Sequence, residues 1–189
     1  MSEKKHKRTF LHTFFSERKQ VGAVAPSSKF LVRSMCNKID FSSAKTIVEF
    51  GPGTGVFTSE LLKRASSDCT IILFELNPTF LRLLNEKFDD PRLIVLDRSA
   101  EDILDVLAER GISEVDAILS SLPLTVIPEK IRMRIISRAH DALRSEGVYV
   151  QYQYSLSAKK LIELKFGKLK MGFVPLNIPP AFVYLGSKS

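Results

Sequence analysis

The chain has 189 residues, of which 44% are hydrophobic and 26% charged, and its formal net charge is +7. This length suits roughly one domain, and the composition excludes wholesale disorder and fibrous structure. No run reaches the about 18 apolar residues that a membrane-spanning helix needs. Cys36 and Cys69 are too few for a disulfide framework, no metal-ligand spacing is present, and no secretory signal precedes them. We therefore expect a cytoplasmic protein with reduced thiols and no metal.

Residues 3–19 are predicted to form an amphipathic helix, because Phe10, Leu11, Phe14 and Phe15 recur on one side of it. The first 20 residues carry six basic side chains against two acidic ones, which suits nucleic acid or an anionic membrane surface. The alternative is a helix that packs on the core with a solvated basic face. A break at 21–26 precedes a second predicted helix over 27–38.

From residue 44 onward, apolar strand patterns alternate with helical patterns. Strands are predicted at 46–50, 70–75, 92–96, 115–120 and 146–153, and helices at 56–65, 78–88, 100–110, 128–144 and 156–164. Such alternation predicts parallel strands with helices on both faces of the sheet. Two further strands at 168–177 and 181–186 lack a full helix between them, so we expect them to pair as an antiparallel hairpin. The predicted fold class is α/β with a mostly parallel seven-stranded sheet.

A glycine-rich loop follows the first predicted strand. Gly51, Gly53 and Gly55 alternate between that strand and a helix, where glycines let the backbone turn sharply and approach a ligand. The spacing G-x-G-x-G differs from the G-x-G-x-x-G of dinucleotide folds, and Glu49 would repel a pyrophosphate but suit a cationic ligand. Glu75 ends the second strand, 20 residues after Gly55, where it can accept both hydroxyls of a ribose. The alternative is that both acids are solvated strand ends.

This constellation resembles the class I S-adenosylmethionine-dependent methyltransferases over residues 44–186, which implies their Rossmann-like fold and S-adenosylmethionine as cofactor. By that resemblance the glycine loop and its acid hold the methionine end, and Glu75 holds the ribose. Relatives carry Gly-Asp-Ala in the adenine segment, where this chain has Arg98, Ser99 and Ala100, and Asp97 and Glu101 remain alternative adenine contacts. The implied cofactor residues are Glu49, Gly51, Gly53, Gly55, Glu75, Leu76, Ser99, Ala100 and Ser120.

The loop after the fourth predicted strand lies beside the transferred methyl group in this family. Adenine-methylating relatives carry Asn or Asp there, then Pro, then an aromatic ring that stacks on the base. Ser121 and Leu124 occupy the polar and aromatic positions here, which argues against a nucleobase acceptor. The candidates for orienting an amine, and hence the predicted catalytic residues, are the carbonyl groups near Ser121 and Leu122, with Tyr152 and Tyr154. The tyrosine rings could also hold a methylated cation, or simply pack at the sheet edge.

Three segments, 21–28, 120–124 and 177–184, resemble the bacterial and archaeal phospholipid N-methyltransferases. The resemblance implies methylation of the phosphatidylethanolamine head group or a related aminolipid. It also implies a peripheral position at the inner membrane face, reached through residues 3–19, with no obligate protein partner. We expect residues 1–43 to form N-terminal amphipathic or lid helices and residues 44–189 to form the S-adenosylmethionine-binding domain.

Two alternatives remain. Ribosomal RNA adenine dimethylases share the fold and a Leu-Pro centre in the loop at 120–124. They usually add a helical RNA-binding domain after the last strand, whereas this sequence stops at Ser189, three residues beyond Gly186. The basic charge nevertheless suits RNA. The other alternative is a non-catalytic protein that retains the S-adenosylmethionine pocket.

Overall fold

The structure is a computed structural model that describes residues 27–189; the helix predicted at 3–19 and the break at 21–26 lie outside this part of the chain. Strands form where apolar runs rich in β-branched residues are bounded by turns. The strands are β1 Thr46–Phe50, β2 Thr70–Glu75, β3 Leu93–Asp97, β4 Val115–Ser120, β5 Leu143–Gln153, β6 Lys170–Val174 and β7 Ala181–Ser187. The helices are α2 Lys29–Cys36, α3 Val56–Arg64, α4 Pro78–Lys87, α5 Ile103–Glu109, α6 Glu129–Ala142 and α7 Lys159–Phe166, with short 3-10 turns η1 Ala100–Asp102 and η2 Leu156–Ala158.

The seven strands form one sheet in the order β3-β2-β1-β4-β5-β7-β6. Neighbouring strands from β3 to β5 are parallel, whereas β7 is antiparallel to both β5 and β6, so the predicted α/β fold and its antiparallel hairpin are confirmed. The chain builds β2 and β3 on one side of β1 and then crosses to β4 on the other side. Ligands of open α/β sheets bind beyond the carboxyl ends of the strands where this order reverses. The fold therefore predicts a ligand site above β1 and β4.

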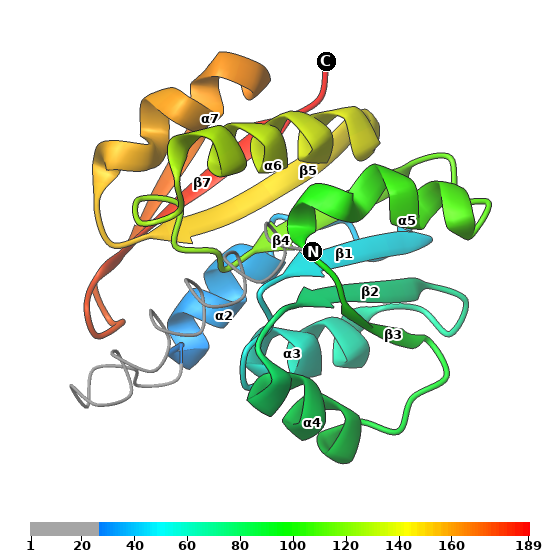
Figure 1. Cartoon of the computed structure of the whole chain (residues 1–189). Helices are drawn as coiled ribbons and strands as arrows, with labels where there is room; N and C mark the ends of the chain where they lie inside the picture. The colour runs from blue at the N-terminus through cyan, green and yellow to red at the C-terminus, as the bar shows by residue number, and fades with distance from the viewer. Residues whose placement is uncertain (1–26) are drawn as a thin grey trace.

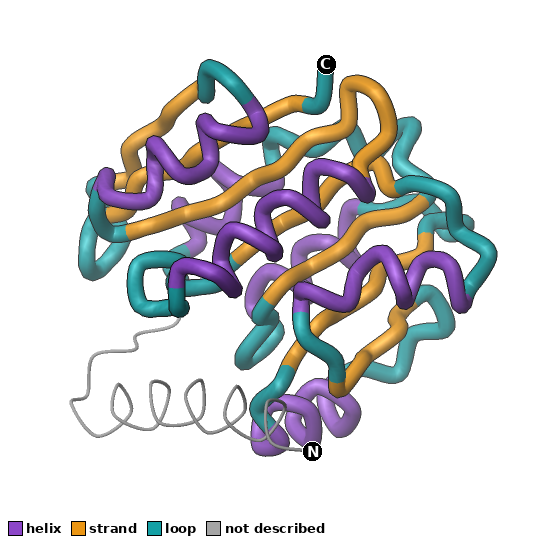
Figure 2. The backbone as a smooth tube through the Cα atoms, turned by 45° about the horizontal axis from the view of Figure 1, so that its top comes forward, coloured by secondary structure: helices purple, strands orange, loops and turns teal. Residues whose placement is uncertain are grey.

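Helices cover both faces of the sheet (Figure 1). One face packs against α2, α3 and α4, and the other against α5, α6 and α7, as the tube in Figure 2 shows from a second direction. The central strand β1 is buried along its whole length because both of its faces are covered. Its side chains alternate between the two faces. Ile47 packs on the face covered by α2, α3 and α4, while Val48 and Phe50 pack on the face covered by α5, α6 and α7. Burying one such side chain contributes about 1.5–3 kcal/mol.

Helix α2 belongs to the N-terminal part of the chain but packs on the sheet. Its residues Leu31, Met35 and Cys36 have no exposed surface, and the Ser28 hydroxyl caps the helix by accepting the Leu31 N–H at 3.2 Å. The Ser28 N–H donates to Oδ1 of Asn177 at 2.9 Å. This bond fixes the start of α2 to the turn between β6 and β7.

The sequence prediction was wrong about where the helix at 128–144 ends. α6 stops at Ala142, and Leu143 and Arg144 begin β5 instead. Leu143 is fully buried and pairs with β4, and Nε of Arg144 lies 2.7 Å from Oδ1 of Asp116 on that strand. These pairings with β4 outweigh the helical pattern, which had treated both residues as the last turn of the helix.

Other element boundaries moved by smaller amounts. The predicted helix at 100–110 begins with the 3-10 turn η1, and the predicted helix at 156–164 begins with η2 and runs on to Phe166. The hairpin strand predicted at 168–177 is shorter, since only Lys170–Val174 pairs with β7. Within residues 27–189, no helix combines the length and apolar character that a bilayer crossing requires.

Candidate active site

The glycine loop turns through left-handed backbone conformations at three positions. φ is +66° at Gly51, +56° at Gly53 and +73° at Gly55, a region that glycine enters far more readily than other residues. A Cβ at Gly55 would lie 2.6 Å from Cε2 of Phe88, and one at Gly51 would lie 3.0 Å from Cδ2 of Leu122. A Cβ at Gly53 would have no neighbour closer than 4.0 Å. The protein thus packs tightly against the two ends of the loop, while its middle glycine leaves space.

Glu49 lies beneath this loop, on β1, and its side chain is completely buried. Oε2 accepts the Thr58 hydroxyl from α3 at 2.7 Å, whereas Oε1 is buried with no hydrogen-bond partner among residues 27–189. Burial raises the pKa of Glu49 to about 8, against the lowering effect of the Thr58 hydrogen bond; the nearby Glu75 carboxyl raises it further. A buried acceptor without a donor is costly, so this site fits a ligand that brings an N–H or ammonium group.

Glu75 ends β2 and reaches across to the glycine loop. Its Oε2 accepts the Gly53 N–H at 3.1 Å, and its Oε1 accepts the N–H groups of Leu76 and Asn77, each at 2.8 Å. Burial raises the pKa of Glu75, while these three backbone hydrogen bonds oppose the shift. A carboxylate has about four lone-pair positions, so Oε2 keeps capacity for a further donor such as a ribose hydroxyl.

The segment proposed to contact adenine follows β3 and forms a cap on η1. The Ser99 hydroxyl accepts the Glu101 N–H at 3.3 Å, and the Ser99 N–H donates to Asp102 at 3.3 Å, which makes a capping box. Asp97 is exposed at the end of β3, while Ala100 is buried. The Ser99 side chain is therefore engaged in capping the turn, and this hydrogen bond holds the segment in one conformation.

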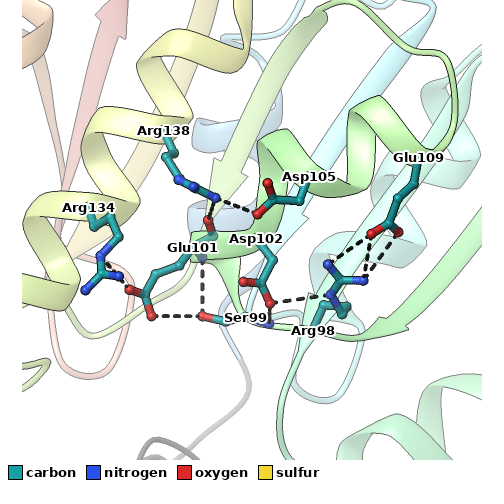
Figure 3. A network of polar contacts seen from close by, with 8 residues as sticks. All are labelled: Arg98, Ser99, Glu101, Asp102, Asp105, Glu109, Arg134 and Arg138. Carbon is teal, nitrogen blue, oxygen red and sulfur yellow. Dashed lines mark hydrogen bonds and ion pairs between the residues drawn. The ribbon is translucent and has the colours of Figure 1, made fainter. Parts of the chain in front are cut away.

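A polar network ties this segment to α6 (Figure 3). Nε of Arg134 lies 3.0 Å from Oε1 of the buried Glu101. Arg138 donates to the Glu101 carbonyl oxygen and to Oδ2 of Asp105, both at 2.7 Å. Ion pairs from one helix thus hold both the start of η1 and the first turn of α5 in place.

The four predicted catalytic residues meet at one cavity of about 110 Å³ beyond the ends of β4 and β5. Its lining comprises Ser121, Leu122, Pro123, Thr125, Val126, Tyr152, Gln153, Tyr154 and Ser155. The Ser121 hydroxyl oxygen is buried and has no hydrogen-bond partner within the described chain. Ser120, predicted to contact the cofactor, is fully buried, and its hydroxyl accepts the Leu122 N–H at 3.4 Å.

The two tyrosines of the cavity form an aromatic pair. The Tyr152 and Tyr154 rings are 5.7 Å apart between centroids and meet edge to face, and Tyr152 also lies 6.0 Å from the Phe57 ring. Both side chains are partly exposed. Aromatic faces at a cavity wall can stabilise a cationic ligand.

Sequence reasoning missed the two glutamines that hold the loop after β4. The Leu122 carbonyl oxygen accepts Nε2 of Gln151 at 3.0 Å and Nε2 of Gln153 at 2.8 Å. Both glutamines are buried, on the same side of β5 as Tyr149. The two-residue alternation of polar side chains at the end of a buried strand is a signal for them, but the sequence prediction named the intervening tyrosines instead. Thr58, the partner of Glu49, gave no such signal.

Residues 15–162 match the sequence profile of the family described as "Ribosomal RNA adenine dimethylase". The chain belongs to the ribosomal RNA adenine dimethylase family. Relatives of this chain differ in their named activities. An ornithine lipid N-methyltransferase of Singulisphaera acidiphila is 30% identical over 93% of this chain and 92% of its own length. A ribosomal RNA small subunit methyltransferase A of Dehalococcoides mccartyi is 31% identical over 79% of this chain, which spans about half of that relative, 49% of its length.

Solved structures support the fold of this family member. A 1,6-didemethyltoxoflavin N1-methyltransferase of Burkholderia thailandensis, solved with S-adenosylhomocysteine bound, superposes with a TM-score of 0.73. The superposition covers 100% of this chain and 92% of the other at 12% identity, so it speaks for the fold alone. The family match and the named relatives together show that the chain is an S-adenosylmethionine-dependent methyltransferase of class I. The contacts of individual residues with the cofactor stay predictions.

Proposed function

We propose that this protein transfers a methyl group from S-adenosylmethionine to the amine of a membrane-lipid head group. The main support is the relative named as an ornithine lipid N-methyltransferase, which matches along nearly the whole of both chains. The loop and hairpin motifs that resemble phospholipid N-methyltransferases favour phosphatidylethanolamine. Both lipids present an aliphatic amine near the membrane surface, and the experiment below separates them.

The chemistry of the cavity supports a small aliphatic amine. Its volume of about 110 Å³ is well below the roughly 300 Å³ at which drug-sized ligand pockets begin, so it suits the end of a head group. Leu124, at the position where adenine-methylating relatives carry a ring, is fully buried in the core and offers no stacking surface. The cavity is instead lined by Ser121, Tyr152 and Tyr154.

Apolar side chains at the cavity also favour a lipid. Val126 lines the cavity and keeps 38% of its surface exposed, and Leu156, next to the lining residue Ser155, keeps 49% exposed. Exposed apolar groups beside a polar pocket suit a substrate whose amine enters the pocket while its acyl chains stay outside.

The mechanism needs positioning more than acid–base chemistry. When bound, S-adenosylmethionine supplies a methyl group on a positively charged sulfur, and Glu49, the glycine loop and Glu75 would hold it above β1. The amine must be uncharged so that its lone pair can form the new N–C bond while the C–S electron pair returns to sulfur. The product is a cationic amine, which the rings of Tyr152 and Tyr154 can stabilise until it loses a proton to water or leaves.

The test offers methyl-labelled S-adenosylmethionine with vesicles containing phosphatidylethanolamine, ornithine lipid or only phosphatidylcholine, and separately with ribosomal RNA. We expect label in the lipid fraction of one or both amine-containing samples and none with phosphatidylcholine alone. A Glu49→Ala variant serves as the cofactor-binding control. Label in RNA and in neither lipid would contradict the proposal and favour adenine methylation, which the family description and the net charge of +7 keep as the second candidate.

A further inference from the structure

The Leu122 carbonyl, a sequence-based candidate for orienting the substrate amine, is already occupied. Gln151 and Gln153 each donate an Nε2–H to it, at 3.0 and 2.8 Å. The Leu124 N–H also donates to it, at 2.9 Å, so this oxygen has three donors for its two lone pairs. In this arrangement Leu122 fixes the loop to β5, and the groups that meet the amine must be sought elsewhere in the cavity.

The two glutamines differ in what their carboxamide oxygens do. Gln151 is fully engaged, because its Nε2 also donates to the Tyr152 carbonyl at 2.8 Å and its Oε1 accepts the Tyr149 hydroxyl at 2.7 Å. Gln153 lines the cavity and is only 6% exposed. Its Nε2 must face the Leu122 carbonyl to donate, so the orientation of its amide is fixed. No hydrogen bond reaches its Oε1 from anywhere in residues 27–189, which leaves an acceptor at the cavity.

We propose that Gln153 is the residue that orients the substrate amine, with its Oε1 and the Ser121 hydroxyl oxygen accepting the two N–H bonds of an uncharged primary amine. The inference rests on the proposed function and adds a specificity-determining residue to that site. Both residues line the same cavity; the Ser121 hydroxyl oxygen has no hydrogen-bond partner within the described chain, and Gln153 uses its Nε2 for the bond to Leu122. The pair would take the place of the Asn or Asp that adenine-methylating relatives carry.

The arrangement makes the number of N–H bonds matter. A primary amine offers two, a monomethylated amine offers one, and a dimethylated amine in its uncharged form offers none. Acceptors that select for N–H bonds therefore favour the first transfer over later ones. A residue that only supports the backbone would affect all transfers alike, so the ratio between substrates distinguishes the two roles.

The experiment compares Gln153→Met with Gln151→Met, using whichever lipid the unaltered protein methylates together with its mono- and dimethylated forms. Methionine has a similar volume without an amide, and each change removes one donor from the Leu122 carbonyl. We expect Gln153→Met to lower kcat/KM for the unmethylated lipid roughly tenfold more than for the dimethylated lipid, as for one lost hydrogen bond to the amine. Gln151→Met should slow all three substrates by a common factor.

A Gln153→Glu variant separates the acceptor from the donor role, because it retains acceptor oxygens but loses the amide that binds Leu122. We expect it to restore the preference for the unmethylated lipid. Equal losses on all three substrates in Gln153→Met, or a Gln153→Glu variant that behaves like Gln153→Met, would overturn the inference. Calorimetric affinity for S-adenosylmethionine verifies that each variant is folded. If the unaltered protein labels no lipid at all, the proposed function itself fails, and this inference with it; activity on lipid with an unchanged Gln153→Met ratio refutes only the inference.

Discussion

At the scale of single residues, Glu49 is the most consequential side chain of the site. It is a carboxyl enclosed by protein, with one oxygen unpartnered and a pKa raised to about 8 by burial. The folded protein therefore holds a proton on Glu49 that the unfolded chain, with an ordinary carboxyl pKa, releases above about pH 4.5. Stability from this group is present at low pH and declines as the pH rises through the interval between these two values.

This sign gives a prediction for the protein without cofactor. Between about pH 5 and pH 8, the free energy of unfolding should fall more steeply for the natural protein than for Glu49→Gln, because glutamine has no proton to lose. Urea unfolding at several pH values measures this difference directly. Identical pH profiles for the two proteins would mean that Glu49 is not protonated in the fold. The acidic groups with lowered pKa values, such as Asp68 and Asp90 at about 2, titrate below this interval and do not obscure it.

The glycine loop gives a second prediction at the same scale. Gly53→Val and Gly55→Val both place a side chain at positive φ, which costs about 1–2 kcal/mol. Only at Gly55 does the new Cβ also collide with the Phe88 ring, which adds roughly 1–3 kcal/mol of overpacking. Gly53→Val should therefore fold with a modestly lower Tm yet lose S-adenosylmethionine binding, because its side chain enters the open side of the loop.

The comparison of the two variants is read by thermal unfolding together with calorimetry. Gly55→Val should show the larger fall in Tm of the two. Unchanged cofactor affinity in a folded Gly53→Val protein would remove this loop from the cofactor site.

At the scale of elements, the sequence predicted the type of each described helix and strand, because hydrophobic periodicity and turn residues are local signals. The end of α6 was mispredicted because Leu143 and Arg144 respond to β4, a strand distant in sequence. The same limit applies to the site. The glycine loop and its acid are contiguous and recognisable, whereas the bond from Gln153 to Leu122 joins positions 31 residues apart and depends on the register of β5 beside β4.

The N-terminal segment carries a prediction at this scale. If residues 3–19 form the amphipathic helix that their pattern predicts, its apolar face would contribute about 0.8 kcal/mol per buried CH₂ in a bilayer, and each basic residue near anionic lipid about 1 kcal/mol. Removing residues 1–19 should weaken sedimentation with anionic vesicles and leave the affinity for S-adenosylmethionine unchanged.

A matched control for this truncation keeps all six basic residues and replaces Phe10 and Phe14 with Ser. It should retain weak, salt-sensitive binding to vesicles, since only the electrostatic contribution remains. Equal vesicle binding by the full-length and truncated proteins would refute a membrane role for this segment.

At the scale of the whole molecule, the fold class followed from strand–helix alternation, and the cofactor and the enzyme class followed from the family resemblance that the glycine loop and its acids carry. The identity of the methyl acceptor did not follow from the sequence in the same way. Relatives of this chain carry names that refer to lipid and to ribosomal RNA. The distinction between such substrates lies in a few side chains around one cavity, and the buried contacts among those side chains appear only once β4 and β5 are placed beside each other.

The hydrogen bond between Ser28 and Asn177 has a consequence for how the molecule could use its first residues. Phe182, near the start of β7, pairs with Gln153, so the β6–β7 turn that holds Ser28 lies at the same edge of the sheet as the cavity. The described chain thus begins, at residue 27, on the side of the sheet where the cavity lies, and 26 residues can reach at most about 90 Å from that point. Any surface that residues 1–26 bind would be held near the cavity at a high effective concentration. Weak binding would then suffice to keep the enzyme at one patch of substrate.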